Sequence, residues 1–407
     1  MKINKLFQEI KHPKVFFRKV VHKTPFFKKL LFMRLNRGKL VNDLNGLSKL
    51  SKEGIVFVFP LPSCPWGYMF QRPQQIARSL SKMGYIVIYT TDTSFPFNPD
   101  WSIRGLVEIE PRIYLFNDGQ NGKLLVELDT SCKVIWQYWP HQYEFIQNLK
   151  LNSARSIWIY DCIDHISTFI SYPNINRDYN DSIFQSDIVL ATSKILYEEI
   201  KSIRPDVILI QNGVCPSDFE TLDSNSTTLQ NKKVVVGYYG AIAEWFDFSL
   251  VKSIAENRPM WKIVLVGEVY ENVRQEVVEL IKIPNIELRK RVSYSEIPSV
   301  LATFDVAILP FILNDITLRT SPVKVFEYLA GGKPAICTKL PELLNVDGLL
   351  LASNADEFIN YIDSALDQLK NAAYIARLKK TAIENSWDSR VKEVIIQINK
   401  VKEVKNE

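Results

Sequence analysis

At 407 residues the chain is too long for a usual single hydrophobic core, so its length predicts two domains of about 150 to 200 residues each. Charged residues at 23% and hydrophobic residues at 46% are ordinary globular values, which exclude a wholly disordered protein. The five cysteines are scattered and form no CxxC pair, so they favour reduced core thiols over disulfides or a zinc site.

The net charge of +5 is distributed unevenly, because residues 1–40 contain twelve Lys or Arg and one acidic residue, Glu9. Aromatic and aliphatic residues are interleaved with these charges at helix-compatible intervals. The pattern predicts a basic amphipathic segment over residues 1–45 that lies on an anionic membrane surface. Nucleic-acid binding and a flexible basic tail are the alternatives, and we expect no nucleic-acid partner. No apolar run has the length of a membrane span and no signal-peptide core is present, so we expect a cytoplasmic protein, peripheral at the inner face of the plasma membrane.

The next part of the chain, residues 46–222, alternates short apolar runs with helical patterns. The runs predict strands at 55–59, 86–89, 113–116, 134–138, 157–160, 188–191 and 207–210. Between the first two, a helix is expected in which Ile76, Leu80 and Met83 share one face. This alternation predicts an α/β domain with a parallel sheet. Residues 220–233 have no apolar periodicity and are interpreted as a linker.

A second α/β domain is predicted at residues 233–385. Its strands are expected at 234–240, 262–266, 286–288, 306–310 and 334–337, with helices at 356–369 and 372–384. A last amphipathic helix, within residues 386–407, is predicted to cross back to the first domain.

The stretch 305–337 is the centre of this second domain. Ser321 is a suitable N-cap and Pro322 a suitable first residue for a helix that runs through Val323 and Lys324. The unpaired amides of its first turn, together with Lys324 and Arg319, favour an anion, most commonly a phosphate. The alternative is a capped helix with a purely structural role.

Motifs in both halves resemble one enzyme family. In the second half the resemblance rests on VGYYG at 236–240, VLVG at 264–267, VSYSEIP at 292–298, DVAILP at 305–310 and SPVKVFEYLAGGKP at 321–334. In the first half it rests on QRPQQIA at 71–77, SDIVLATS at 186–193 and QNGV at 211–214. In order and spacing these motifs resemble the GT-B glycosyltransferases, especially family 4 enzymes of bacterial surface polysaccharide synthesis.

The resemblance implies two doubly wound Rossmann-like domains that face a cleft. It also implies a retaining transfer without a metal or other cofactor, from a nucleotide-diphosphate sugar to a glycan or lipid-linked glycan acceptor. Glu327 matches the second glutamate of the family's paired motif and is expected to bind the donor ribose. Arg319 stands where the first glutamate is expected, and the usual basic residues after Gly240 are missing. Lys290, Arg319 or Lys324 is expected to compensate at the diphosphate.

The candidate catalytic residues follow apolar strands of the first half. His141, Asp161, Asp164 and His165 are expected to face the cleft, whereas a capping or loop network and packed side chains are the structural alternatives. A GT-B sugar-nucleotide epimerase and a non-catalytic scaffold of a polysaccharide assembly complex remain as rival functions. A dehydrogenase is disfavoured because no GxGxxG follows any of the strands.

Overall fold

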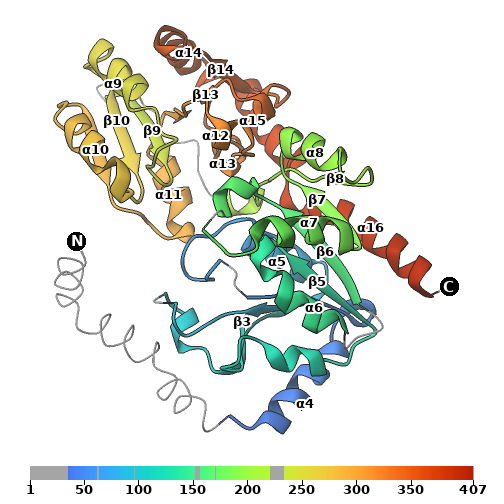
Figure 1. Cartoon of the computed structure of the whole chain (residues 1–407). Helices are drawn as coiled ribbons and strands as arrows, with labels where there is room; N and C mark the ends of the chain where they lie inside the picture. Colours follow the sequence, from blue (N-terminus) through green and yellow to red (C-terminus); the bar gives the residue numbers. More distant parts are fainter. Residues whose placement is uncertain are drawn as a thin grey trace. The chain divides into compact units, whose positions relative to one another are not determined.

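The computed structural model describes residues 35–406 apart from 62–63, 96, 152–155, 170 and 221–232 (Figure 1). Most of the membrane segment predicted at 1–45 and most of the linker predicted at 220–233 lie outside the described residues. The chain divides into two compact units. Unit 1 consists of Met1–Leu190, Ile200–Ile208 and Val391–Glu407, and unit 2 consists of Ala191–Glu199 and Leu209–Arg390.

Unit 1 is built on an eight-stranded sheet in the order β3-β4-β2-β1-β5-β6-β7-β8. The strands are β1 (Ile55–Phe59), β2 (Ile86–Thr90), β3 (Gly105–Glu110), β4 (Ile113–Asn117), β5 (Cys132–Gln137), β6 (Ser156–Cys162), β7 (Ile188–Ala191) and β8 (Ile208–Leu209). Every strand predicted in the first half is present, and β3, which pairs antiparallel with β4, was not predicted. The chain builds outward from β1 in one direction and from β5 in the other. The boundary between β1 and β5 is therefore the switch point at which open α/β sheets bind ligands.

The helices of the first half are α4 (Arg37–Ser48), α5 (Arg72–Lys82), α6 (Tyr143–Leu151), α7 (Ile175–Gln185) and α8 (Lys194–Lys201). In α4, Leu40, Leu44 and Leu47 are buried in one apolar cluster with β1 residues. Residues 37–45 of the predicted membrane segment therefore pack on unit 1. None of the helices in the described part of the chain has the length and hydrophobicity needed to cross a membrane.

Unit 2 contains a six-stranded parallel sheet in the order β11-β10-β9-β12-β13-β14. The strands are β9 (Val235–Tyr239), β10 (Lys262–Val266), β11 (Ile286–Arg289), β12 (Val306–Leu309), β13 (Ala335–Thr338) and β14 (Leu349–Ala352). The order reverses between β9 and β12, so the carboxyl ends of these two strands mark the ligand-binding edge. This architecture confirms the prediction of two α/β domains with largely parallel sheets.

The helices that follow are α9 (Phe248–Asn257), α10 (Arg274–Leu280), α11 (Ile297–Ala302), α12 (Asp315–Leu318), α13 (Val323–Ala330), α14 (Ala355–Gln368), α15 (Ala372–Glu384) and α16 (Trp387–Asn406). From Val391 onward α16 belongs to unit 1, where Lys405 donates to the Ser156 carbonyl at 2.7 Å and pairs with Asp187 at 2.8 Å.

A buried lysine in β5 predicts how stability depends on pH. Lys133 is 0% exposed and donates to the Leu125 carbonyl at 2.8 Å, and burial lowers its pKa to about 8. The pKa of Lys133 in the folded protein is lower than in the unfolded chain, so burying the charged ammonium group costs folding free energy. The full cost applies below about pH 8, where the group is charged in both states. The cost shrinks as the pH rises from about 8 to 10.5, because the folded protein then loses the proton first. Lys133→Met should raise the free energy of unfolding at pH 7 by about 2 to 3 kcal/mol.

Urea unfolding of both proteins across pH 7 to 10 measures this effect. The stability gain from Lys133→Met should shrink with rising pH. Lys123→Met, at an exposed position, is the matched control and should change little. A gain that does not vary with pH would contradict the assignment of a charged buried Lys133.

Candidate functional site

The start of α13 differs from its prediction in one detail. Pro322, with φ −72° and ψ 114°, is the N-cap, and α13 begins at Val323, so the prediction of Ser321 as N-cap is wrong. The Ser321 hydroxyl accepts instead from the Asn212 backbone N–H at 3.3 Å, and the Ser321 carbonyl accepts from Asn212 Nδ2 at 2.7 Å. The helix therefore has no side-chain cap, which leaves its first-turn amides suited to an anion.

Gly240, which follows β9, is in contact with Lys324 in the first turn of α13. Gly240 has φ +138°, and a Cβ there would lie 2.0 Å from Lys324 Cε and 2.8 Å from Nζ. The half-buried ammonium group of Lys324 therefore lies over the Gly240 backbone. Burial lowers the pKa of Lys324, and the carboxylate of Glu327 opposes that shift.

The loop after β9 is held by the loop after β10. Gly240 donates its N–H to the Val266 carbonyl at 2.9 Å, and Ile242 donates to the Glu268 carbonyl at 2.9 Å. A Cβ at Gly267 would lie 1.8 Å from the Gly240 oxygen, so this approach requires glycine at 267. These contacts position the Gly240 backbone beside Lys324.

This packing predicts a strong effect of a methyl group at residue 240. Gly240→Ala strains a backbone with positive φ and displaces Lys324, so nucleoside diphosphate affinity should fall by about tenfold or more. Calorimetric titration measures the change. Gly46→Ala is the control, because a Cβ there meets nothing within 4 Å. Unchanged affinity in Gly240→Ala would mean that Lys324 does not contribute to binding.

Glu327 lies one helical turn after Lys324 and is only 6% exposed. Its Oε2 accepts a 2.7 Å hydrogen bond from the Tyr239 hydroxyl of β9. Burial raises the pKa of Glu327, while the Tyr239 hydrogen bond and the charge of Lys324 act in the opposite direction. Asp218, which accepts from the Tyr294 hydroxyl at 3.0 Å, raises that pKa further. The structure thus brings a cation, a carboxylate and hydroxyl groups together at the switch point of unit 2.

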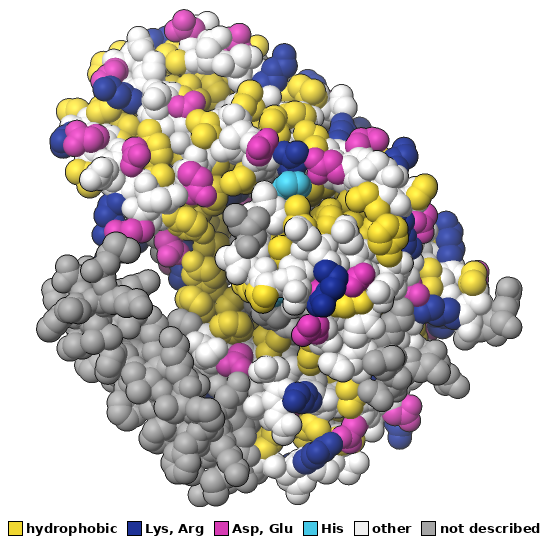
Figure 2. All heavy atoms as spheres, viewed as in Figure 1, with side chains coloured by type: hydrophobic (Ala, Val, Ile, Leu, Met, Phe, Trp, Pro, Cys, Tyr) yellow, Lys and Arg dark blue, Asp and Glu magenta, His cyan; other side chains and the backbone are white. Residues whose placement is uncertain are grey.

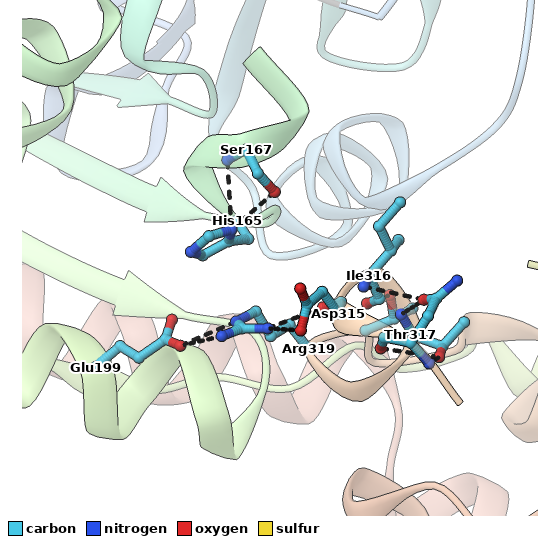
Figure 3. Close-up of polar contacts among 9 residues, drawn as sticks. His165, Ser167, Glu199, Asp315, Ile316, Thr317 and Arg319 are labelled. Carbon is cyan, nitrogen blue, oxygen red and sulfur yellow. Dashed lines mark hydrogen bonds and ion pairs between the residues drawn. The ribbon is translucent and has the colours of Figure 1, made fainter. Parts of the chain in front are cut away.

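Arg319 follows α12 and is engaged by carboxylates of the protein (Figure 3). Its Nη2 lies 2.8 Å and its Nε 2.9 Å from Glu199 Oε1, and its Nη1 lies 3.4 Å from Asp315 Oδ1. The hydrogen bond to Glu199 raises the pKa of Arg319. A diphosphate would have to compete with Glu199 for this guanidinium group, so a contact of Arg319 with the donor stays a prediction.

Lys290, the third basic candidate, follows β11 and is exposed. In the sheet order, β10 lies between β11 and β9. Lys290 therefore follows the edge strand of the sheet, two strands away from β9, whereas Gly240 and Lys324 are in contact at the switch point. A role for Lys290 at the diphosphate stays a prediction.

In unit 1, Asp161 is part of a buried ion pair. Strand β6 extends through Cys162 and so includes Asp161, whose oxygens accept from Arg72 Nε at 2.8 Å and Nη2 at 3.0 Å. The Trp136 indole donates a further bond at 2.9 Å. Asp161 is 0% and Arg72 3% exposed. Asp161 therefore has a structural role, because its carboxylate neutralises Arg72 at the start of α5. A catalytic role for Asp161 stays a prediction.

The other three candidates of unit 1 lie in loops at the carboxyl ends of β5 and β6. The His165 Nδ1 lies 2.8 Å from the Ser167 hydroxyl (Figure 3). Asp164 has an exposed side chain. Burial lowers the pKa of the His141 imidazole to about 4, so this ring is neutral at physiological pH. His141 stacks on Tyr172 with centroids 3.9 Å apart.

Sequence reasoning missed Tyr239 and Asp218, because both act through contacts with distant residues. Tyr239 belongs to an apolar strand pattern, and no local signal indicates that its hydroxyl reaches Glu327. Within the described ranges, no group of three or more His, Cys, Asp and Glu side chains is placed to hold a metal ion.

Comparison with known proteins relates the second half of the chain to glycosyltransferases. A family model described as Glycosyl transferases group 1 matches residues 232–368, which include Gly240, Lys324 and Glu327. The chain is 24% identical over 262 residues to the putative teichuronic acid biosynthesis glycosyltransferase TuaH of Bacillus subtilis (strain 168). That alignment covers 58% of this chain and 65% of the relative's length.

Two solved structures share the fold. The Anabaena protein HepE, crystallised with UDP and glucose, has a TM-score of 0.60 and 15% identity over 85% of this chain and 99% of its own. The sucrose-phosphate synthase of Thermosynechococcus elongatus has a TM-score of 0.61 and 14% identity over 85% of this chain and 98% of its own. At such identities the likeness establishes the fold alone, and the resemblance to family 4 in particular stays a prediction. The chain therefore has the GT-B glycosyltransferase fold, and its residues 232–368 match the family model described as Glycosyl transferases group 1.

Proposed function

We propose that this protein is a glycosyltransferase that moves a sugar from a nucleotide-diphosphate donor to a glycan acceptor in surface polysaccharide synthesis. The proposal rests on one observation. Lys324 contacts Gly240 at the start of α13, which has no side-chain cap, and the buried Glu327 follows in the same helix. All of these residues lie within the range of the family match.

The chemistry of the donor fits these groups. The first-turn amides of α13 and the Lys324 ammonium bind the diphosphate, and the Glu327 carboxylate accepts hydrogen bonds from the ribose diol. During transfer the bond from the sugar C1 to the diphosphate oxygen breaks, a bond from C1 to the acceptor hydroxyl oxygen forms, and the proton of that hydroxyl passes to the leaving diphosphate. Negative charge then develops on the leaving diphosphate, where the helix start and Lys324 stabilise it. We infer a reaction with no metal or other cofactor, since these groups supply positive charge at the leaving group. A retaining outcome is what the resemblance to the GT-B glycosyltransferases implies.

The acceptor is inferred to be a glycan, carried on a lipid. The relative TuaH is named for teichuronic acid biosynthesis, and the basic amphipathic composition of residues 1–40 suits an anionic membrane surface. On the face drawn in Figure 2, acidic and basic side chains of the described residues are interspersed, whereas nucleic-acid sites favour clustered basic side chains. We therefore infer a cytoplasmic enzyme that is peripheral to the membrane, and no nucleic-acid partner.

The test is a screen of nucleotide sugars with the full chain, in which release of nucleoside diphosphate is followed with and without membrane-extracted glycan acceptors. Acceptor-dependent release from one donor is the expected result. A change in the sugar's configuration without an acceptor would indicate an epimerase instead. No turnover of any donor would indicate a scaffold.

A further inference from the structure

Three rings of unit 1 form a nearly parallel stack that the donor site does not explain. Trp139 and His141 lie with centroids 5.7 Å apart at 14°, and His141 and Tyr172 with centroids 3.9 Å apart at 1°. Phe169 contacts His141 at 5.8 Å in a tilted arrangement. This aromatic stack, defined as Trp139, His141 and Tyr172, is held rigidly because each ring is packed against the next.

The stack lies at the carboxyl edge of the unit 1 sheet. Trp139 comes shortly after β5, and Tyr172 belongs to the loop that follows β6. These two strands are parallel neighbours, and β5 borders the switch point of the sheet. Ligands of open α/β sheets bind at this edge.

Tyr172 presents aromatic surface to solvent. Tyr172 is 45% exposed although the His141 ring lies parallel to its ring with centroids 3.9 Å apart. An exposed ring that its neighbour already orders offers contact area at little cost in conformational entropy.

The segment between β6 and α7, which carries Tyr172, is rich in polar side chains. Ser167, Thr168 and Ser171 are exposed on the same loop, and the exposed carboxyl group of Asp164 precedes them. The imidazole of His141 is neutral at physiological pH, so the stack carries no charge of its own. A flat neutral aromatic face on a segment with exposed hydroxyl and carboxyl groups suits a pyranose ring, whose C–H groups pack on the aromatic face while its hydroxyls form hydrogen bonds.

We propose that Tyr172, backed by His141 and Trp139, forms a subsite for one pyranose ring of the glycan acceptor. This inference rests on the proposed transferase function, because it assigns the acceptor's position in unit 1. It goes beyond the donor site of unit 2, which it does not involve.

The test uses the full chain and a panel of p-nitrophenyl pyranosides of glucose, galactose, N-acetylglucosamine, N-acetylgalactosamine and glucuronic acid. Saturation-transfer NMR identifies a ligand, and titration measures its affinity. Tyr172→Ala and Tyr172→Leu should each weaken binding of that pyranoside by about tenfold, whereas Tyr172→Phe should stay within about twofold of the wild type. Phe184→Ala, which removes another exposed aromatic side chain of unit 1, is the matched control and should leave affinity unchanged.

Two results would overturn the subsite. One is that no pyranoside of the panel binds the wild-type protein. The other is that binding survives undiminished in Tyr172→Ala. Nucleoside diphosphate affinity, measured on the same Tyr172→Ala protein, should equal that of the wild type. Pyranoside binding without any nucleotide binding in the wild type would contradict the proposed transferase while leaving the sugar subsite intact.

Discussion

Replacing Glu327 by glutamine should weaken nucleoside diphosphate binding by roughly 10- to 100-fold, the range expected for losing hydrogen bonds to a charged group. The buried carboxylate accepts from the Tyr239 hydroxyl at 2.7 Å, which orients it for a ribose diol. Glutamine keeps the volume of the side chain but removes the charge that strengthens these bonds. Calorimetric titration of both proteins with the nucleotide that the wild type binds measures the loss.

The pH dependence of this binding gives an independent check. The folded pKa of Glu327 is raised, chiefly by burial, so protonation on acidification begins at a higher pH than for an ordinary glutamate. Affinity should therefore fall as pH falls through that raised pKa, because the protonated group accepts from the diol poorly. The decline should be absent in Glu327→Gln.

Glu279→Gln serves as the matched control for Glu327→Gln, because Glu279 is an exposed acid of unit 2 that pairs with Lys282. Its affinity should match the wild type, and Tyr239→Phe should give an intermediate loss. If Glu327→Gln bound the nucleotide as tightly as the wild type, Glu327 would be a structural residue only.

Asp161→Ala should lower the free energy of unfolding by about 3 to 5 kcal/mol, because it removes the carboxylate that pairs with the buried charge of Arg72. Arg72 is 3% exposed, and the hydrogen bonds from its Nε and Nη2 to Asp161 would be lost. Urea unfolding, monitored by tryptophan fluorescence, measures the loss. This prediction distinguishes a structural Asp161 from a catalytic one, since a purely catalytic residue could be removed at little cost in stability.

The double variant Arg72→Met/Asp161→Leu should recover most of the lost stability, because it removes both charges together. Asp164→Ala, at the exposed carboxyl group of the following loop, is the comparison and should cost far less. A stable Asp161→Ala protein with abolished transfer would contradict the structural role and support the catalytic prediction.

The fold was predictable where an apolar run in the sequence fits only one kind of secondary structure. The buried parallel strands β1 and β10, for example, are short apolar runs bounded by turn residues, and both were predicted at their observed positions. Strand β3 was missed because its GLVEIE sequence mixes apolar and acidic residues on a partly exposed edge strand. The start of α13 was displaced by one residue, because Asn212, far away in the sequence, takes the hydroxyl expected to cap the helix.

The site was predictable where its residues share one element. Lys324 and Glu327 stand three positions apart on α13, so their proximity follows from helix geometry alone. The contact of Tyr239 with Glu327 joins residues 88 positions apart, and that of Arg319 with Glu199 joins residues 120 positions apart. Such contacts depend on how strands and helices assemble, which hydrophobic periodicity does not encode. The same is true of the stack formed by Trp139, His141 and Tyr172.

The most direct test of the donor site is calorimetric titration of the full chain with UDP, GDP, ADP, CDP and dTDP. One of these nucleotides should bind with one-to-one stoichiometry, and Gly240→Ala and Glu327→Gln should each weaken its binding while Gly46→Ala should not. Absence of binding by all five nucleotides, or binding that both site variants leave intact, would contradict a nucleotide-sugar site at the start of α13.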